Sequence, residues 1–219
     1  MTSSSRATLG YIAPFVLYVA MFAVPLPPEW LQPIRLVLTF AVIVAVSRPY
    51  LPLRPSYLLA STAVGVAVFV VWVAPDLLFH YRHHWLFENA LLGHSSSTLA
   101  PDLHRDYFFL TVRVITSVLL VPVLEELFWR GWFLRWLINS NDFQKVPLGT
   151  YQAASFWIVA LLFALEHGSY WEVGLMAGII YNAWIIRTRN LADCILAHAI
   201  TNGVLAVYVL AAGQWQYWL

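Results

Sequence analysis

Long apolar blocks with almost no charge recur along the whole chain, and no other feature constrains its fold as strongly. A helix needs about 20 mostly apolar residues to cross the hydrocarbon core of a membrane, and most blocks approach that length. They lack the alternation of apolar and polar residues that marks the strands of a membrane barrel. We therefore predict an all-α fold, a polytopic membrane helical bundle of about seven transmembrane helices, with six or eight as alternatives. The predicted helices cover residues 9–26, 33–47, 57–75, 107–124 with a continuation to about 138, 151–168, 171–187 and 191–212.

The composition excludes other broad classes of protein. Charged residues make up 11% of the chain, against about 25% in soluble domains, which is too little to cover a water-exposed surface. The net charge of +1 excludes nucleic acid as a partner and leaves membrane lipid as the surrounding medium. The single cysteine, Cys194, permits no internal disulfide. No pattern in the sequence predicts an oligomeric state.

Proline and glycine mark the breaks between the blocks. The longest stretch between blocks, residues 76–106, is expected to lie at the membrane interface or to re-enter the membrane. The spacing of His80 and His84 leaves a metal site there as a second interpretation. That stretch contains His80, His83, His84, His94 and His104, and the breaks fall at Pro27-Pro28, at Pro49 with Pro52, and at Pro147 with Gly149.

Basic residues gather on one side of the predicted topology. The side opposite to the N-terminus keeps only Arg82 and Arg105, which share their loop with acidic residues. The positive-inside rule therefore predicts a cytoplasmic N-terminus. The first block has no small-residue cleavage site after it, so we expect a retained helix and not a removed signal peptide. The basic residues on the predicted cytoplasmic side are Arg6, Arg48, Arg54, Arg135, Lys145, Arg187 and Arg189.

Ionisable residues inside the predicted spans raise a functional hypothesis, because charges are costly in a membrane. The fourth block ends in VLEELFWRGWF, where Glu126 and Arg130 are four residues apart and share a helix face. Glu125 is rotated by about 100° from Glu126 and is therefore expected to point into a cavity. A plain helix end that reaches the interface is the alternative for this cluster.

Two further polar clusters lie on other apolar helices. FALEHGSYWE places Phe163 and His167 four residues apart, with Glu166 beside the histidine. LAHAITNGV places His198 and Asn202 on one face of the last helix. We expect all three clusters to meet at one polar site inside the bundle.

These residue types can hydrolyse an amide bond. Glu125 with His167 can activate a water molecule, and His198 with Asn202 can donate hydrogen bonds to the oxyanion. That division requires no metal and no other cofactor. Glu125, His167 and His198 also match the ligand set of a catalytic zinc, and the sequence does not separate the two mechanisms. A third interpretation, a Cys-His-Asn protease built from Cys194, leaves the glutamates without a role.

At these residues the chain resembles the CPBP (Abi) family of intramembrane proteases, which includes the type II CAAX prenyl endopeptidase. The match rests on EExxxR, FxxxH and HxxxN, found in the family's order within residues 107–212. The resemblance implies that Glu125 and His167 activate water, that His198 and Asn202 bind the oxyanion, and that Glu126, Arg130 and Phe163 support them. It divides the chain into N-terminal transmembrane helices with a long loop (1–106) and a catalytic helical core (107–219).

The resemblance further implies an endopeptidase in the inner membrane of a bacterium. Its substrate would be a membrane-associated protein or peptide, either lipidated in the CAAX manner or carrying another C-terminal tag. The chain is also similar in general character to the CAAX-protease-related group associated with exosortases. A proton-coupled transporter and a non-catalytic immunity or binding protein are the alternatives, since intramembrane Glu and His also build proton relays.

Helix lengths conflict with the predicted site at one point. Glu125 lies about 27 Å along the fourth helix from its start at Tyr107, and His198 lies in the same half of the membrane. His167 falls at the far end of the fifth predicted helix, too distant to join them. A fifth helix that begins later, tilts or stops short would remove the conflict.

Overall fold

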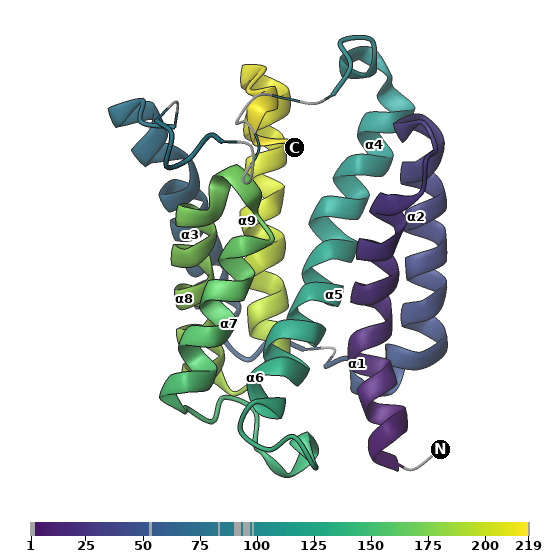
Figure 1. Ribbon diagram of the computed structural model, residues 1–219, viewed down its shortest axis with the longest axis vertical. Coiled ribbons are helices and arrows are strands. Elements are labelled where there is room, and N and C mark those ends of the chain that lie inside the picture. The colour runs from purple at the N-terminus through teal and green to yellow at the C-terminus, as the bar shows by residue number, and fades with distance from the viewer. Residues whose placement is uncertain are drawn as a thin grey trace.

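The computed structural model describes residues 3–52, 54–82, 84–89, 93, 97 and 99–218, and these form the all-α bundle that the sequence predicts. The helices run along one common axis (Figure 1). His83 and His94 lie outside the described residues. The α-helices are α1 (Ser3–Ala20), α2 (Pro28–Val42), α3 (Leu58–Phe79), α4 (Tyr107–Ile115), α5 (Val121–Glu126), α6 (Leu134–Trp136), α7 (Ala153–Leu165), α8 (Trp171–Thr188) and α9 (Leu191–Ala212).

All seven apolar blocks are helical. Five helical stretches are long and apolar enough to cross a membrane. The other two are α7, with 13 residues, and α8, with 18. The second stretch is longer than predicted, because it begins at Pro28. Proline is tolerated in the first turn of a helix, where a backbone N–H would have no partner within the helix. The five stretches are Ser5–Ala23, Pro28–Tyr50, Leu58–Phe79, Tyr107–Trp136 and Leu191–Ala212.

Polar side chains cap the first turns of α4 and α9. The carboxylate of Asp106 accepts a hydrogen bond from the backbone N–H of Phe109 (3.0 Å), which caps α4. The side chain of Asn190 caps α9 in the same way, through the N–H of Ala192 (3.0 Å). Only two residues separate α8 from α9, because Arg189 takes a left-handed conformation that ends α8.

The two ends of the bundle differ in the charged residues that they carry. The α2–α3 loop, the α6–α7 loop and the α8–α9 turn lie at the same end as the N-terminus, and we call this the basic end (Figure 1). These connections contain Arg54, Lys145 and Arg189. Its loops are joined, since the Asn190 side chain donates to the backbone carbonyl of Arg54 (3.0 Å). The opposite end carries Asp76, in the last turn of α3, and Arg82 on the loop that follows α3. These loops lie at the ends of the bundle that the sequence analysis assigned to them. The assignment of the basic end to the cytoplasm stays a prediction.

The last helix, α9, lies at the centre of the bundle and packs along α3, with further contacts to α5 and α8. Gly65 of α3 makes the α3–α9 contact close, because a Cβ there would lie 2.4 Å from the backbone oxygen of Ala197 and 2.7 Å from Ile200. Thr201 of α9 adds a hydrogen bond to the Gly65 carbonyl (2.8 Å). Small residues allow such close helix contacts in membranes.

Replacing Gly65 with alanine should therefore destabilise the bundle. The added methyl overlaps the α9 backbone, and overpacking costs about 1–3 kcal/mol. Gly203→Ala is the matched control, because the nearest atom to its added Cβ is 3.6 Å away. Alanine is also the better helix former by about 1 kcal/mol. Thermal unfolding in detergent should show a lower midpoint for Gly65→Ala only. Equal midpoints for both variants would contradict the close α3–α9 contact.

Candidate active site

The stretch from Tyr107 to Trp136 is one helix interrupted by two wide π-helical segments. These segments, Thr116–Leu120 and Leu127–Phe133, lie directly before and after α5. Such wide turns are frequent at functional sites because they shift which side chains face a neighbour. The two glutamates of α5, Glu125 and Glu126, both contact His198 of α9.

Glu126 and Arg130 form the predicted ion pair, and both side chains are completely buried. Arg130 Nη1 lies 3.1 Å from Glu126 Oε1, and the same carboxylate oxygen is 2.9 Å from Nδ1 of His198. Arg130 also donates to the side-chain oxygen of Asn182 on α8 (3.1 Å). Its guanidinium carbon lies 4.4 Å from the ring centroid of Phe163 on α7. One arginine thus connects α5, α7 and α8.

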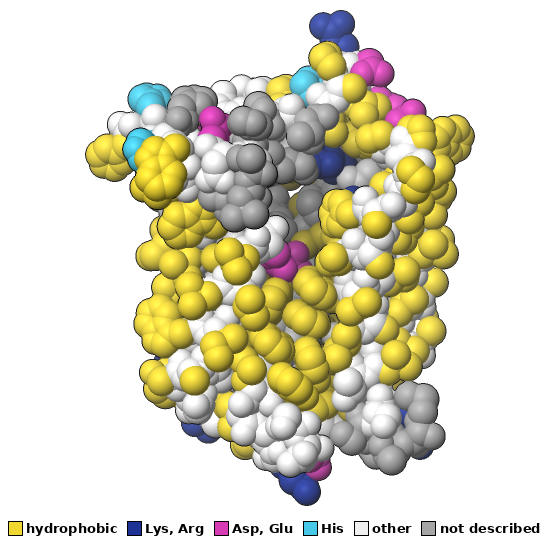
Figure 2. Space-filling model, viewed as in Figure 1, with side chains coloured by type: hydrophobic (Ala, Val, Ile, Leu, Met, Phe, Trp, Pro, Cys, Tyr) yellow, Lys and Arg dark blue, Asp and Glu magenta, His cyan; other side chains and the backbone are white. Residues whose placement is uncertain are grey.

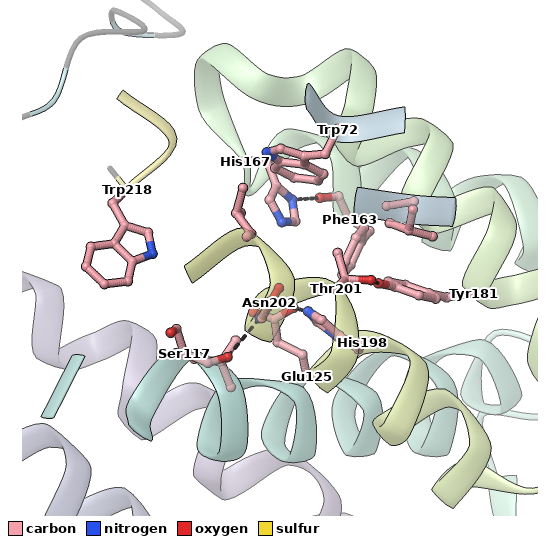
Figure 3. Close-up of a pocket in the computed structure, with 14 residues that line it drawn as sticks. Trp72, Ser117, Glu125, Phe163, His167, Tyr181, His198, Thr201, Asn202 and Trp218 are labelled. Carbon is pink, nitrogen blue, oxygen red and sulfur yellow. Dashed lines mark hydrogen bonds and ion pairs between the residues drawn. The ribbon is translucent and has the colours of Figure 1, made fainter. Parts of the chain in front are cut away.

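Glu125 faces a cavity of about 150 Å³ inside the bundle. Its Oε2 is buried and has no hydrogen-bond partner among the described residues, and it lies 3.9 Å from Nε2 of His198. Figure 3 shows Glu125 and Ser117 on one wall and His167 on the opposite wall. The cavity is lined by Val68, Trp72, Ser117, Val121, Glu125, Phe163, His167, Ala177, Tyr181, His198, Thr201, Asn202, Leu205 and Trp218.

The two polar residues of α9 are fixed by different partners. The ring of His198 stacks on Tyr181, with 5.2 Å between ring centroids. The hydroxyl of Tyr181 in turn lies 2.7 Å from that of Thr201. Asn202 donates from Nδ2 to the backbone carbonyl of Ser117 (2.8 Å), in the π-helical segment before α5. Glu126 binds Nδ1 of His198, and the Ser117 carbonyl binds one amide hydrogen of Asn202. His198 Nε2 and the rest of the Asn202 amide therefore face the cavity (Figure 3).

His167 reaches the cavity because α7 stops short. The predicted fifth helix, 151–168, is wrong at its end, since α7 ends at Leu165 and His167 lies in the turn before α8. Thirteen residues span only about 20 Å, so the α7–α8 hairpin turns below the outer end of α9 (Figure 1). His167 Nδ1 lies 2.7 Å from the carbonyl oxygen of Phe163, and its ring contacts the edge of Trp72.

Several residues near the cavity carry no signal that sequence reasoning could use. Trp72 and Trp218 line the cavity, yet tryptophan in an apolar chain is ordinary at helix ends and interfaces.

Glu166, in contrast, had a signal in the sequence, since it directly precedes His167. Its side chain is exposed, accepts a hydrogen bond from Trp129 Nε1 (3.3 Å), and interacts with the carboxyl group of Glu125.

The three residues of the zinc alternative, Glu125, His167 and His198, all line the cavity, and metal binding by them stays a prediction. Among the described residues, no group of three or more His, Cys, Asp or Glu side chains could hold a metal ion. His167 lies across the cavity from Glu125 (Figure 3). The described part of the 76–106 loop likewise places no such group around His80 and His84. Cys194 is buried beneath Tyr181 and is not part of the cavity lining.

Comparison with known protein families finds one match in this part of the chain. Residues 107–204 match the family described as type II CAAX prenyl endopeptidase Rce1-like. The matched range includes every predicted site residue from Glu125 to Asn202, and over this range the chain is similar to the Rce1-like family. No curated protein and no solved structure matches the chain. The apolar helices indicate an integral membrane protein, and the family match supports an intramembrane endopeptidase in general.

Arg130→Met should destabilise the protein strongly. Removing the cation leaves the carboxylate of Glu126 buried and uncompensated, which costs about 3–5 kcal/mol. The matched control is Lys145→Met, because Lys145 is 77% exposed in its pair with Asp142 and exposed pairs contribute about 0–1 kcal/mol. Unfolding in detergent measures both effects. The double variant Glu126→Gln with Arg130→Met should recover part of the loss, and no recovery would contradict this account of the pair.

Proposed function

We propose that this protein is an intramembrane endopeptidase that hydrolyses a peptide bond in a membrane-associated protein or peptide. One observation carries the proposal. Glu125, His167, His198 and Asn202, from three separate helical segments, surround a single cavity within the segment that matches the Rce1-like family. Processing near a CAAX-type or otherwise tagged C-terminus is the substrate class that the family suggests. The inner membrane of a bacterium, with the basic end in the cytoplasm, is the proposed location.

Glu125 and His167 are the proposed groups that activate water. The carboxylate oxygen Oε2 of Glu125 has no hydrogen-bond donor among the described residues, so it is available to accept a proton from a water in the cavity. His167 Nδ1 lies beside the Phe163 carbonyl and must therefore donate to it. In the neutral ring this leaves Nε2 as an acceptor, which can orient the same water molecule from the other wall.

His198 and Asn202 are the proposed donors to the oxyanion. Nδ1 of His198 donates to the carboxylate of Glu126, so Nε2 can donate only when the ring carries both protons. Because Arg130 already pairs with Glu126, the charge of such a ring is balanced by Glu125, whose Oε2 lies 3.9 Å from His198 Nε2. Asn202 uses one amide hydrogen for the Ser117 carbonyl, and its second amide hydrogen can bind the oxyanion. The leaving amine then receives the proton that Glu125 removed from water.

Glu125→Gln should abolish peptide cleavage while the protein still inserts and folds. The amide keeps the shape of the side chain but cannot accept the proton, and loss of a general base costs about 10²–10⁴-fold in rate. His167→Ala and His198→Ala should also lose activity. Glu29→Gln, at the start of α2 and away from the cavity, is the matched control. Cleavage of membrane peptide substrates in proteoliposomes is the measurement, and normal cleavage by Glu125→Gln would refute the proposed base.

The metal-free mechanism predicts that strong chelators leave cleavage unchanged. In this mechanism every proton transfer uses a side chain, so no step depends on an ion. Activity should be measured before and after dialysis against a chelator, and again after zinc is added. Loss of activity that zinc restores would instead favour a metal mechanism. Analysis of bound metal in the purified protein provides a readout that does not depend on the substrate.

A further inference from the structure

A short segment of the chain folds back over the cavity. Residues 214–218 follow α9, and Trp215–Tyr217 form a single tight helical turn. The side chain of Trp218, at the end of this turn, is 5% exposed and lines the cavity beside the catalytic residues. Figure 3 shows its ring on the side of the cavity away from Tyr181.

The contacts of this segment resemble those of a bound peptide. The hydroxyl of Tyr170 donates to the backbone carbonyl of Gln216 (2.8 Å), and Tyr217 donates to the carboxylate of Asp76 (3.2 Å). The ring of Trp218 also makes a cation–π contact, since the guanidinium carbon of Arg113 lies 5.2 Å from its centroid. The chain itself therefore shows that a peptide segment with an aromatic side chain fits here.

The cavity is closed towards the basic end. Below Glu126 and Arg130 the bundle is tightly packed, and the side chains there have exposures of 0–1%. No water-filled route between those side chains is compatible with such packing. These residues are Leu127, Leu134, Ile185, Leu191 and Cys194.

Towards the opposite end, in contrast, the same helices leave space. A second hollow of about 460 Å³ lies between α4 and α9, beside Trp215. Its α4 wall, which ends at Val114 and Ile115, leads along the same continuous helix to Ser117, Val121 and Glu125 in the cavity wall. Eleven residues of helix span about 16 Å, which is the length of about five residues of extended peptide. Figure 2 shows a recess on this face, in the half towards the opposite end.

We propose that the peptide substrate reaches the cavity from the opposite end, along the seam between α4 and α9, and that Trp218 is the gate it displaces. Because the basic end is the proposed cytoplasmic end, the substrate is a segment exposed on the non-cytoplasmic side of the membrane. It binds in an extended form, with an apolar or aromatic side chain in the place of Trp218. The substrate part of this proposal rests on the proposed peptidase function, but the route does not.

Cysteine labelling tests the route without measuring cleavage. Val121→Cys places a thiol in the cavity wall, in a Cys194→Ala background. A membrane-impermeant maleimide is applied to intact spheroplasts and to inverted membrane vesicles. Lys145→Cys reports the basic end, where the native side chain is 77% exposed. We expect Val121→Cys to react in spheroplasts and Lys145→Cys to react in inverted vesicles.

Adding Trp218→Ala tests the gate. Removing the ring should raise the labelling rate of Val121→Cys by about tenfold, which corresponds to 1.4 kcal/mol of closure free energy. Trp218→Phe retains an aromatic ring and should change the rate less. Trp30→Ala is the matched control, because Trp30 is 65% exposed and lies on α2. Unchanged unfolding midpoints establish that each variant is folded.

Two results would overturn the proposal. Labelling of Val121→Cys only from the side that labels Lys145→Cys would refute the direction of access. Equal labelling rates for Trp218→Ala and Trp30→Ala would refute the gate. The same labelling in a Glu125→Gln protein should be unchanged, since access does not require catalysis. A failed cleavage assay would therefore refute the peptidase while the labelling result remains valid.

Discussion

A charged group buried within apolar helices is the constraint on which the rest of this structure depends. Arg130 and Glu126 are both completely buried, and an unpaired charge at that depth costs several kcal/mol. The pair is therefore tolerated only if the surrounding helices supply further partners. They do so through Asn182 on α8, Phe163 on α7 and His198 on α9. The helices that must satisfy these charges are the same ones that bring the proposed catalytic side chains together.

The short hairpin of α7 and α8 decides the depth of the site. A fifth helix of full membrane length would carry His167 to the surface, away from Glu125 and His198. Because α7 ends at Leu165, its turn lies within the bundle, where Trp72 and Tyr170 pack around it. Irregular backbone at membrane depth is tolerated where protein or a cavity surrounds it.

A polar cluster at the opposite end holds the outer wall of the cavity in place. The guanidinium of Arg82 is 2.8 Å from the carboxylate of Glu172 on α8 and lies over the ring of Tyr170. Tyr81 donates to the same carboxylate (3.0 Å). Burial and the neighbouring Glu172 raise the pKa of Tyr81 to about 12, so its hydroxyl stays a donor over the physiological range. The loop after α3 is thereby tied to the α7–α8 turn and to Trp72.

The sequence by itself determined the membrane bundle, its seven helical blocks, and the polar residues that a membrane would not otherwise tolerate. Apolar length and the high cost of buried charge act locally, so they can be read from residues such as Glu125, Glu126 and Arg130. The end of α7 could not be predicted in this way, because Glu166 and His167 follow an uninterrupted apolar run. The turn is placed by tertiary packing, which includes the contacts of His167 and Tyr170 with Trp72 of α3. Tertiary structure alone also decided the roles of Trp72 and Trp218 in the cavity wall, since contact between distant segments depends on how the helices meet.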